Sequence, residues 1–471
     1  MRSRVFIGRG ILRGGAWVVA AAVVNAVTTI VINGLLARLM DPTSVGMYFA
    51  LYSASLTAAS LCLLGMNQSI VRLVSNSLAE QRPDRAKASI RSAVIVLFAT
   101  LSIFGVVLYS HILPLRLIVS AEPQSVGIAY FFLWTGVLAV RTLMAEAFRG
   151  FHEIGAATLF SGLLTSIFTV IALAVLIELE GAASIKIVLF IVIGATLLVA
   201  AISSWRLVTY TRGVATGPPT PILSLIRRSF PLLGSTAGFL LRRDSHLWLL
   251  AMISPMSEVA TLGAALYFVR FLTVPLALMN SLIQPFVAHL HATSEPQKLK
   301  VLLRGSASCV AIGSFCGLII VALFGRELLS MVYGEHYTTA YIALLIISVG
   351  QLINVGTGSP GVLLAMSGNE QYVLVSSLLA ASVGLSVTLA VAPVYGANGA
   401  ATGIASAVAL HNLAMWIFAR RRVGIWTHAS WAALLCGLGT VYRTVDAQKN
   451  RGVVARWAEM LLRPFKDYER D

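Results

Sequence analysis

The chain alternates between apolar runs of about 20 residues or more and short segments that carry charge, proline or glycine. A helix that rises ~1.5 Å per residue needs about 20 apolar residues to cross a hydrocarbon layer ~30 Å thick. The runs lie near 14–36, 45–75, 89–110, 127–148, 155–177, 184–208, 230–253, 259–291, 301–324, 337–365, 371–393 and 399–419. The pattern therefore predicts an all-α polytopic membrane protein with about twelve transmembrane helices.

A long connection rich in proline and glycine, within residues 210–229, divides the twelve runs into six and six. Short motifs recur in order on either side of it: Asp41-Pro42 and Ser254-Pro255 precede the second and eighth runs, and Gly-Ala-Ala occurs at 181–183 and 399–401. An even number of helices per half makes the repeats parallel, with a central cavity between them. We expect an N-lobe at 1–213, a cytoplasmic linker at 214–229, a C-lobe at 230–425 and a basic cytoplasmic tail at 426–471, lying on the membrane surface or in solution.

Composition supports this class of protein. Hydrophobic residues make up 58% of the chain and charged residues only 11%, and the mean hydropathy is +0.84, which excludes a soluble globular enzyme. The four cysteines stand in apolar surroundings without a Cys-x-x-Cys spacing, so neither a disulfide framework nor a zinc site is expected. We expect no cofactor and no metal.

The positive charge is distributed unevenly along the chain. If the N-terminus is cytoplasmic, 26 of the 35 Lys and Arg residues fall in inner segments and only four in outer segments. Inner loops of membrane proteins carry such an excess, so we expect both termini to be cytoplasmic. The net charge of +16 then needs no nucleic acid as a partner. The other five cations are all arginines and lie inside the predicted spans: Arg72, Arg141, Arg242, Arg243 and Arg270.

The seventh run is the most unusual, because Arg242, Arg243, Asp244 and His246 lie near its middle. A charge at the bilayer centre costs at least about 2.5 kcal/mol, so such residues face a bundle interior or a watery cavity. In a continuous helix Asp244 would point away from Arg242 and His246. Two interpretations follow: an anion-binding or coupling site, or a structural ion pair between Asp244 and an arginine of another helix, either Arg270 or Arg141.

Several segments resemble polysaccharide (O-antigen, Wzx-type) flippases of the multidrug, oligosaccharidyl-lipid and polysaccharide exporter superfamily. They are LLARLMDPTSVGMYFALYS at 35–53, GMNQSIVRLVS at 65–75, AFRGFHEIGAATL at 147–159, YGEHYTTAYIALLIISVGQLIN at 333–354 and VYGANGAATGIASAVALHNLAMWIFARRRVGI at 394–425. The resemblance implies a two-lobed bundle that moves a polyprenyl-diphosphate-linked glycan across the bacterial inner membrane by alternating access, for O-antigen, capsule or exopolysaccharide biosynthesis. Besides that glycan and the lipid bilayer, a polysaccharide polymerase is a partner that the resemblance leaves open.

Such a substrate needs a cavity that binds a diphosphate. Arginine suits this task better than lysine, because its planar fork binds phosphate oxygens in pairs and does not lose its proton. We expect Arg242, Arg243 and Arg270 to hold the diphosphate and Arg141 to supply charge from the opposite lobe. Asp244 and His246 are candidates for an ion pair or for coupling to a proton or sodium gradient, and the sequence does not decide whether transport is coupled.

Other functions fit the sequence less well. An ATP-driven exporter needs the Gly-Lys of a phosphate-binding loop, and the chain has no Gly-Lys dipeptide. A membrane polymerase or ligase would carry a large external catalytic loop, so we expect a transporter and not an enzyme. The main alternative is a cation-coupled multidrug or small-molecule exporter of the same superfamily, which would need carboxylates inside the membrane. A membrane scaffold without transport is the remaining possibility, and the cost of its buried arginines argues against it.

Overall fold

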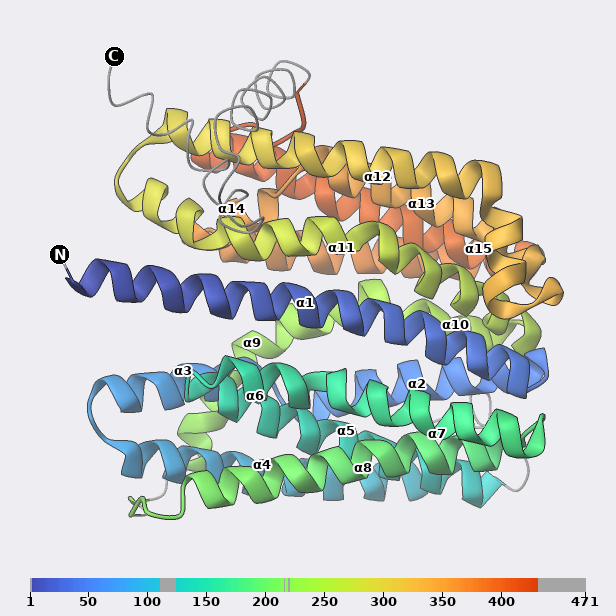
Figure 1. Ribbon diagram of the computed structural model, residues 1–471, viewed down its shortest axis with the longest axis horizontal. Helices are drawn as coiled ribbons and strands as arrows, with labels where there is room; N and C mark the ends of the chain where they lie inside the picture. The colour runs from blue at the N-terminus through green and yellow to red at the C-terminus, as the bar shows by residue number, and fades with distance from the viewer. Residues whose placement is uncertain (1, 111–123, 216, 219–220, 431–471) are drawn as a thin grey trace.

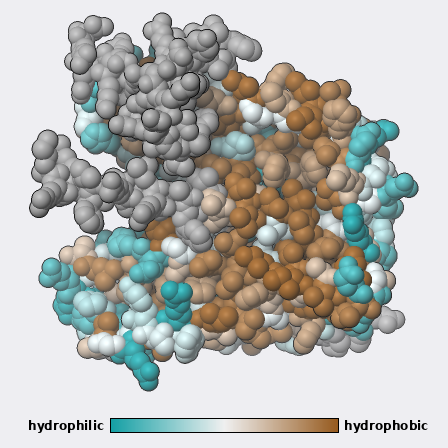
Figure 2. Space-filling model, in the orientation of Figure 1, coloured by the Kyte–Doolittle hydropathy of each residue, from teal (hydrophilic) through white to brown (hydrophobic). Residues whose placement is uncertain are grey.

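The computed structural model describes residues 2–110, 124–215, 217–218 and 221–430. The described residues form helices and no β-strand, and ten of these helices are long and apolar enough to cross a membrane. On the face shown in Figure 2, apolar side chains form a broad band, and polar side chains gather toward its margins. The predicted fold class, an all-α polytopic membrane protein, is confirmed.

The first half of the chain begins with the long helix α1. Its helices are α1 (Arg2–Leu39), α2 (Pro42–Cys62), α3 (Met66–Ala79), α4 (Pro83–Tyr109), α5 (Gln124–Gly150), α6 (Ile154–Thr158), a π-helical turn (Leu159–Leu163), α7 (Leu164–Glu180) and α8 (Ile185–Tyr210). The Asp41-Pro42 motif starts α2, because the Asp41 carboxylate accepts hydrogen bonds from the backbone N–H groups of Thr43 and Ser44. The predicted span 45–75 is broken after Cys62, where Leu64 and Gly65 adopt left-handed conformations with φ of 47° and 78°.

The second half begins inside the predicted linker, since α9 starts at residue 222. Its helices are α9 (Ile222–Arg243), α10 (Ser245–Ile253), α11 (Met256–Ala292), α12 (Pro296–Tyr333), a 3-10 turn (Glu335–Ala340), α13 (Tyr341–Thr357), α14 (Pro360–Met366) and α15 (Glu370–Val423). Helix α15 turns sharply at Gly396, where φ is 51°. Its two arms cover the predicted spans 371–393 and 399–419, and α9 with α10 covers 230–253. The twelve predicted runs correspond to the ten long helices, the second arm of α15 and the pair formed by α9 and α10.

The prediction that 230–253 is one continuous helix is wrong. Helix α9 ends at Arg243 and α10 begins at Ser245, with Asp244 between them at φ −111° and ψ −17°. The angular argument that placed Asp244 on a separate face therefore does not apply. The predicted span 337–365 is also broken, at Gly358 with φ 78°. A side chain at Gly358 would overlap the Thr427 carbonyl, so close approach of residues 424–430 requires glycine there.

The two halves of the chain meet along α1, α2 and α9–α11. In Figure 1, α1 lies between the group formed by α2–α8 and the group formed by α11–α15, and it contacts α7 on one side and α11 and α12 on the other. Helix α2 packs closely on α11: a Cβ atom on Gly46 would overlap the Met256 carbonyl, and one on Gly263 would overlap the Phe49 ring. Helix α9 crosses between the groups and contacts both α3 and α15. The middle of α9–α11 is thus held at the centre of the molecule.

The start of the predicted tail is folded onto the second half. Thr427 donates a hydrogen bond to the Thr357 carbonyl (2.7 Å), which fastens residues 424–430 to the end of α13. His428 lies between Trp416 Nε1, 3.2 Å from its Nδ1, and Arg304 Nη2, 3.2 Å from its Nε2. Burial, and then the charge of Arg304, lowers the pKa of His428 below its usual value. Residues 431–471 lie outside the described residues. The location of this part of the tail, on the membrane surface or in solution, therefore stays a prediction.

Candidate anion-binding site

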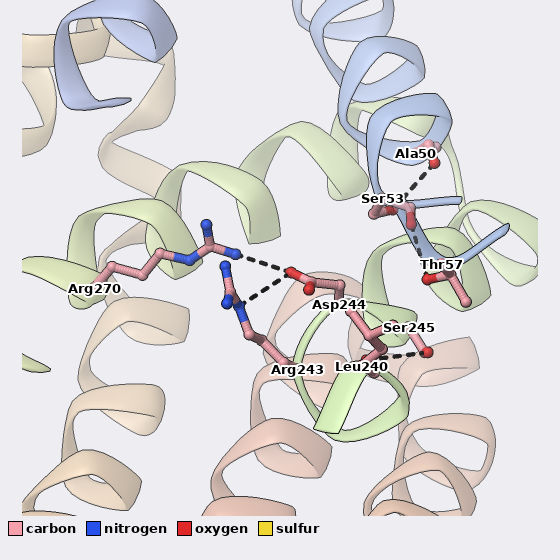
Figure 3. A network of polar contacts seen from close by, with 8 residues as sticks. All are labelled: Ala50, Ser53, Thr57, Leu240, Arg243, Asp244, Ser245 and Arg270. Carbon is pink, nitrogen blue, oxygen red and sulfur yellow. Dashed lines mark hydrogen bonds and ion pairs between the residues drawn. The ribbon is translucent and has the colours of Figure 1, made fainter. Parts of the chain in front are cut away.

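The centre of the candidate site is the carboxylate of Asp244, at the break between α9 and α10. Asp244 is 2% exposed, and its Oδ1 atom accepts a hydrogen bond from Arg270 Nη2 at 2.9 Å. Arg243 Nε lies 3.5 Å from the same oxygen. Figure 3 shows the two guanidinium groups converging on this oxygen, Arg243 from the end of α9 and Arg270 from the middle of α11. Of the two partners predicted for Asp244, Arg270 is the one in contact.

The ion pair lies at the break between α9 and α10. An isolated buried carboxylate would be very costly, so Asp244 needs a cation close by. Arg270 is 26 residues further along the chain and belongs to another helix. The Asp244 N–H still donates to the Leu240 carbonyl at 2.8 Å, so α9 ends with an ordinary helical hydrogen bond. The side chain is thereby held beside α11.

Aromatic rings support the arginines. The Arg270 guanidinium lies 4.5 Å from the centre of the Tyr267 ring, and those of Arg243 and Arg242 lie 5.4 and 5.7 Å from the centre of the Phe239 ring. Such cation–π contacts contribute about 0.5–2 kcal/mol each. Sequence reasoning missed both rings, although their positions three or four residues before the arginines place them on the same side of a helix.

Arg242 and His246 lie outside the ion pair. No ion pair of the described residues involves Arg242, and its Nε atom is buried without a hydrogen-bond partner. His246 is completely buried, and its Nδ1 atom lies 2.8 Å from Thr388 Oγ1 on α15. The His246 ring therefore packs into the second half of the protein, and it makes no ion pair within the described part of the chain.

Arg141 is placed in the first half, apart from Asp244. It belongs to α5, and its Nη1 atom donates a hydrogen bond to Thr165 Oγ1 on α7 at 3.3 Å. The alternative pairing of Asp244 with Arg141 is therefore wrong, because Arg141 faces α7.

The site carries more positive than negative charge. The candidate residues include four arginines, Arg141, Arg242, Arg243 and Arg270, but only one carboxylate, Asp244, which leaves three positive charges among these five residues. The two other carboxylates near span ends are engaged elsewhere: Glu146 pairs with Arg149 at 2.7 Å, and Glu258 accepts a hydrogen bond from the backbone of Ala397 at 2.7 Å.

The exposed fractions determine how this charge is presented. The side chains of Arg243 and Arg270 are 39% and 29% exposed, whereas Asp244 is buried. The two arginine side chains, and not the carboxylate, are therefore accessible. This arrangement attracts anions. In the described part of the chain, no group of three His, Cys, Asp or Glu residues could hold a metal ion.

Comparison with known proteins identifies the family and the fold. The model of the family described as "polysaccharide biosynthesis protein" matches residues 11–291. The structure of the lipid II flippase MurJ in an inward closed conformation is similar at a TM-score of 0.68 and 9% identity, covering 95% of this chain and 98% of that one. An inward-facing multidrug resistance MATE transporter of the MOP superfamily is similar at a TM-score of 0.66 and 15% identity, covering 85% and 94%.

A third similar structure is that of a mutant of the Vibrio cholerae MATE transporter VcmN, at a TM-score of 0.54 and 14% identity, covering 90% of this chain and 98% of that one. Comparison with curated protein sequences gives no match. At these identities the structures show a shared fold.

Proposed function

Because the chain belongs to the polysaccharide biosynthesis protein family, we propose that it is a flippase for a polyprenyl-diphosphate-linked oligosaccharide. The protein would act by alternating access in the bacterial inner membrane, with both termini in the cytoplasm. Its product would serve the biosynthesis of a surface polysaccharide such as O-antigen, capsule or exopolysaccharide. The structural similarity to a lipid II flippase supports the same class of lipid-linked substrate.

The observation that carries the proposal is the pairing of Asp244 with Arg243 and Arg270. A polyprenyl diphosphate joined to a sugar carries about two negative charges. Arg242, Arg243 and Arg270 together with Asp244 have a net charge of two positive units, which matches the diphosphate. Asp244 uses one N–H of Arg270 and the Nε side of Arg243, so the remaining N–H groups of both forks are free to bind phosphate oxygens in pairs.

The site also suits movement between two states. Helices α9 and α10 both contact α2 and α15, but α9, which ends at Arg243, also contacts α3 and α4, and α10, which begins after Asp244, also contacts α11. A rotation of α9 at the break would move Arg242 and Arg243 relative to Arg270. A bound diphosphate would favour the arrangement in which the three forks surround it, because a ligand shifts a conformational equilibrium by its difference in affinity for the two states. The glycan would occupy the aqueous space and the polyprenyl tail would stay in the lipid.

The second candidate is a cation-coupled multidrug or small-molecule exporter, and the similarity to MATE transporters favours it. A cation or a cationic drug requires a free carboxylate inside the membrane. Among the described residues at this site the only such group, Asp244, is already shared by two arginines. The flippase is therefore the better proposal.

The two candidates differ in what they move. The test uses vesicles that contain the purified protein and either a fluorescent polyprenyl-diphosphate sugar or a fluorescent cationic dye, each with and without a proton or sodium gradient. The flippase moves the lipid-linked sugar and leaves the dye where it is. Gradient-driven movement of the dye without movement of the sugar would instead establish the exporter.

A further inference from the structure

Arg141 has surroundings of its own in the first half of the protein. Its hydrogen-bond partner, Thr165, lies on α7 just after the π-helical turn Leu159–Leu163. A Cβ atom on Gly162, within this turn, would lie 3.9 Å from both Arg141 Nη1 and Asn25 Oδ1. Arg141 and Asn25 therefore border the same small space. π-Helical turns are rare and occur frequently at functional sites.

The polar groups around this space are mostly hydrogen-bond donors. Ser166 Oγ donates to Asn25 Oδ1 at 3.5 Å, and no hydrogen bond of the described residues uses the amide nitrogen of Asn25. Arg141 Nε is buried and has no hydrogen-bond partner among the described residues. Asn25 is exposed although it lies within the apolar part of α1, which is costly unless it faces water or a ligand. The Arg141 guanidinium therefore borders the space with a hydrogen-bonding capacity that the described residues do not fill, and the amide of Asn25 lies beside it.

The charge of Arg141 is not compensated within the protein. No ion pair in the described ranges includes Arg141, and the nearby Glu146 is paired with Arg149. The diphosphate proposed above already balances Arg242, Arg243 and Arg270 together with Asp244. One positive charge is therefore left over, and it is that of Arg141, which lies on α5 beside α7 in the first half of the protein.

We infer that Arg141 binds a carboxylate on the glycan, so that the lipid-linked oligosaccharide is acidic and carries a uronic acid or another carboxylated sugar. This inference rests on the flippase function proposed above. A carboxylate has one negative charge and two oxygens in a plane, which fit one guanidinium fork. Asn25 donates its amide to the same group, and Thr165 holds the Arg141 side chain in place. The two halves of the protein then bind different parts of one substrate.

The test compares two glycans that differ only in the carboxylate. One probe is a polyprenyl-diphosphate trisaccharide that ends in glucuronic acid, and the other is the same molecule after reduction of the carboxyl group to an alcohol. Their dissociation constants are measured with the purified full-length protein in nanodiscs. Charge-assisted hydrogen bonds predict that the wild type prefers the acidic probe roughly 10- to 100-fold.

Variants show whether Arg141 produces the preference. Arg141→Gln abolishes it, whereas Arg141→Lys, which keeps the charge and loses the planar fork, retains part of it. Arg326→Ala is the control, because Arg326 is an exposed arginine near the end of α12, where it lies 5.2 Å from the centre of the Tyr341 ring and away from the space beside Gly162. It keeps the full preference. Thermal unfolding of each variant confirms that it is folded.

Three results would overturn the inference in distinguishable ways. Equal affinity of the wild type for the two probes would remove the acidic glycan and leave the flippase function standing. Equal loss of affinity for both probes in Arg141→Gln would assign Arg141 to the diphosphate. Failure of the wild type to bind either probe would reject the proposed function together with this inference.

Discussion

Replacing Asp244 by asparagine removes the negative charge from the centre of the site and preserves the size of the side chain. Asp244 is buried, and its Oδ1 atom is bonded to Arg270 at 2.9 Å and lies 3.5 Å from Arg243. The asparagine oxygen can still accept a hydrogen bond, but the two arginines then lie close together without a counter-charge. We expect the folded protein to lose stability.

The structure sets the size of this loss. Breaking a buried ion pair by removing one partner costs about 3–5 kcal/mol. The Arg243 and Arg270 side chains keep 39% and 29% of their surface exposed, and the solvent can partly compensate their charge. The cost should therefore lie near the lower end of that range, at about 3 kcal/mol. In Asp244→Asn/Arg270→Gln one of the two unpaired cations is also gone, so this double variant should lose about 1–2 kcal/mol less than the sum of the two single variants.

The assay is equilibrium unfolding in mixed micelles, followed by tryptophan fluorescence. Asp84→Asn is the matched control, because Asp84 is also paired with an arginine, Arg82, at 3.1 Å but at the polar end of α4. It should change stability little. Wild-type stability of Asp244→Asn, or strict additivity in the double variant, would show that the ion pair does not hold α9, α10 and α11 together.

Three further predictions concern other parts of the molecule. Cysteine at Glu180 should react with an impermeant thiol reagent in intact cells, and cysteine at Glu153, at the opposite end of the same span, should not; the reverse labelling would invert the topology. Gly46→Leu should lower the unfolding temperature because its side chain would overlap the Met256 carbonyl, and an unchanged unfolding temperature would contradict this packing. The pKa of His428 is lowered in the folded state, so the folded state binds fewer protons than the unfolded state below pH ~6.5. Residues 424–430 should therefore exchange amide hydrogens faster at pH 5.5 than at pH 7.5 after correction for intrinsic rates, and His428→Gln should abolish the difference.

The sequence predicts the membrane spans well because their signal is local. A run of about 20 apolar residues is sufficient to indicate a spanning helix, and the Asp41-Pro42 motif marks the start of α2 as it would in any helix. The breaks at Asp244 and Gly358 were missed. Each depends on a contact with a distant segment: Asp244 with Arg270, and Gly358 with the Thr427 carbonyl. Apolar periodicity contains no information about such contacts.

The candidate site was predicted only in part, because contacts between distant segments determine how its residues are arranged. The cost of charge inside a membrane identifies Arg141, Arg242, Arg243, Asp244 and Arg270 from the sequence alone. It does not tell which of them touch, because that depends on how helices from the two halves are arranged. The neutral aromatic rings around the arginines carry no such cost, so they were not found.

The central claim is that the arginines around Asp244 bind the diphosphate of a lipid-linked glycan. It is tested most directly by measuring how fast a fluorescent polyprenyl-diphosphate oligosaccharide crosses vesicle membranes that contain Arg243→Ala, Arg270→Ala or the control Arg326→Ala. We expect affinity for the substrate to fall roughly 10- to 100-fold in each of the first two variants, with a matching loss of transport at low substrate concentration. The control should behave like the wild type. Transport at the wild-type rate by well-folded Arg243→Ala and Arg270→Ala proteins would contradict the account.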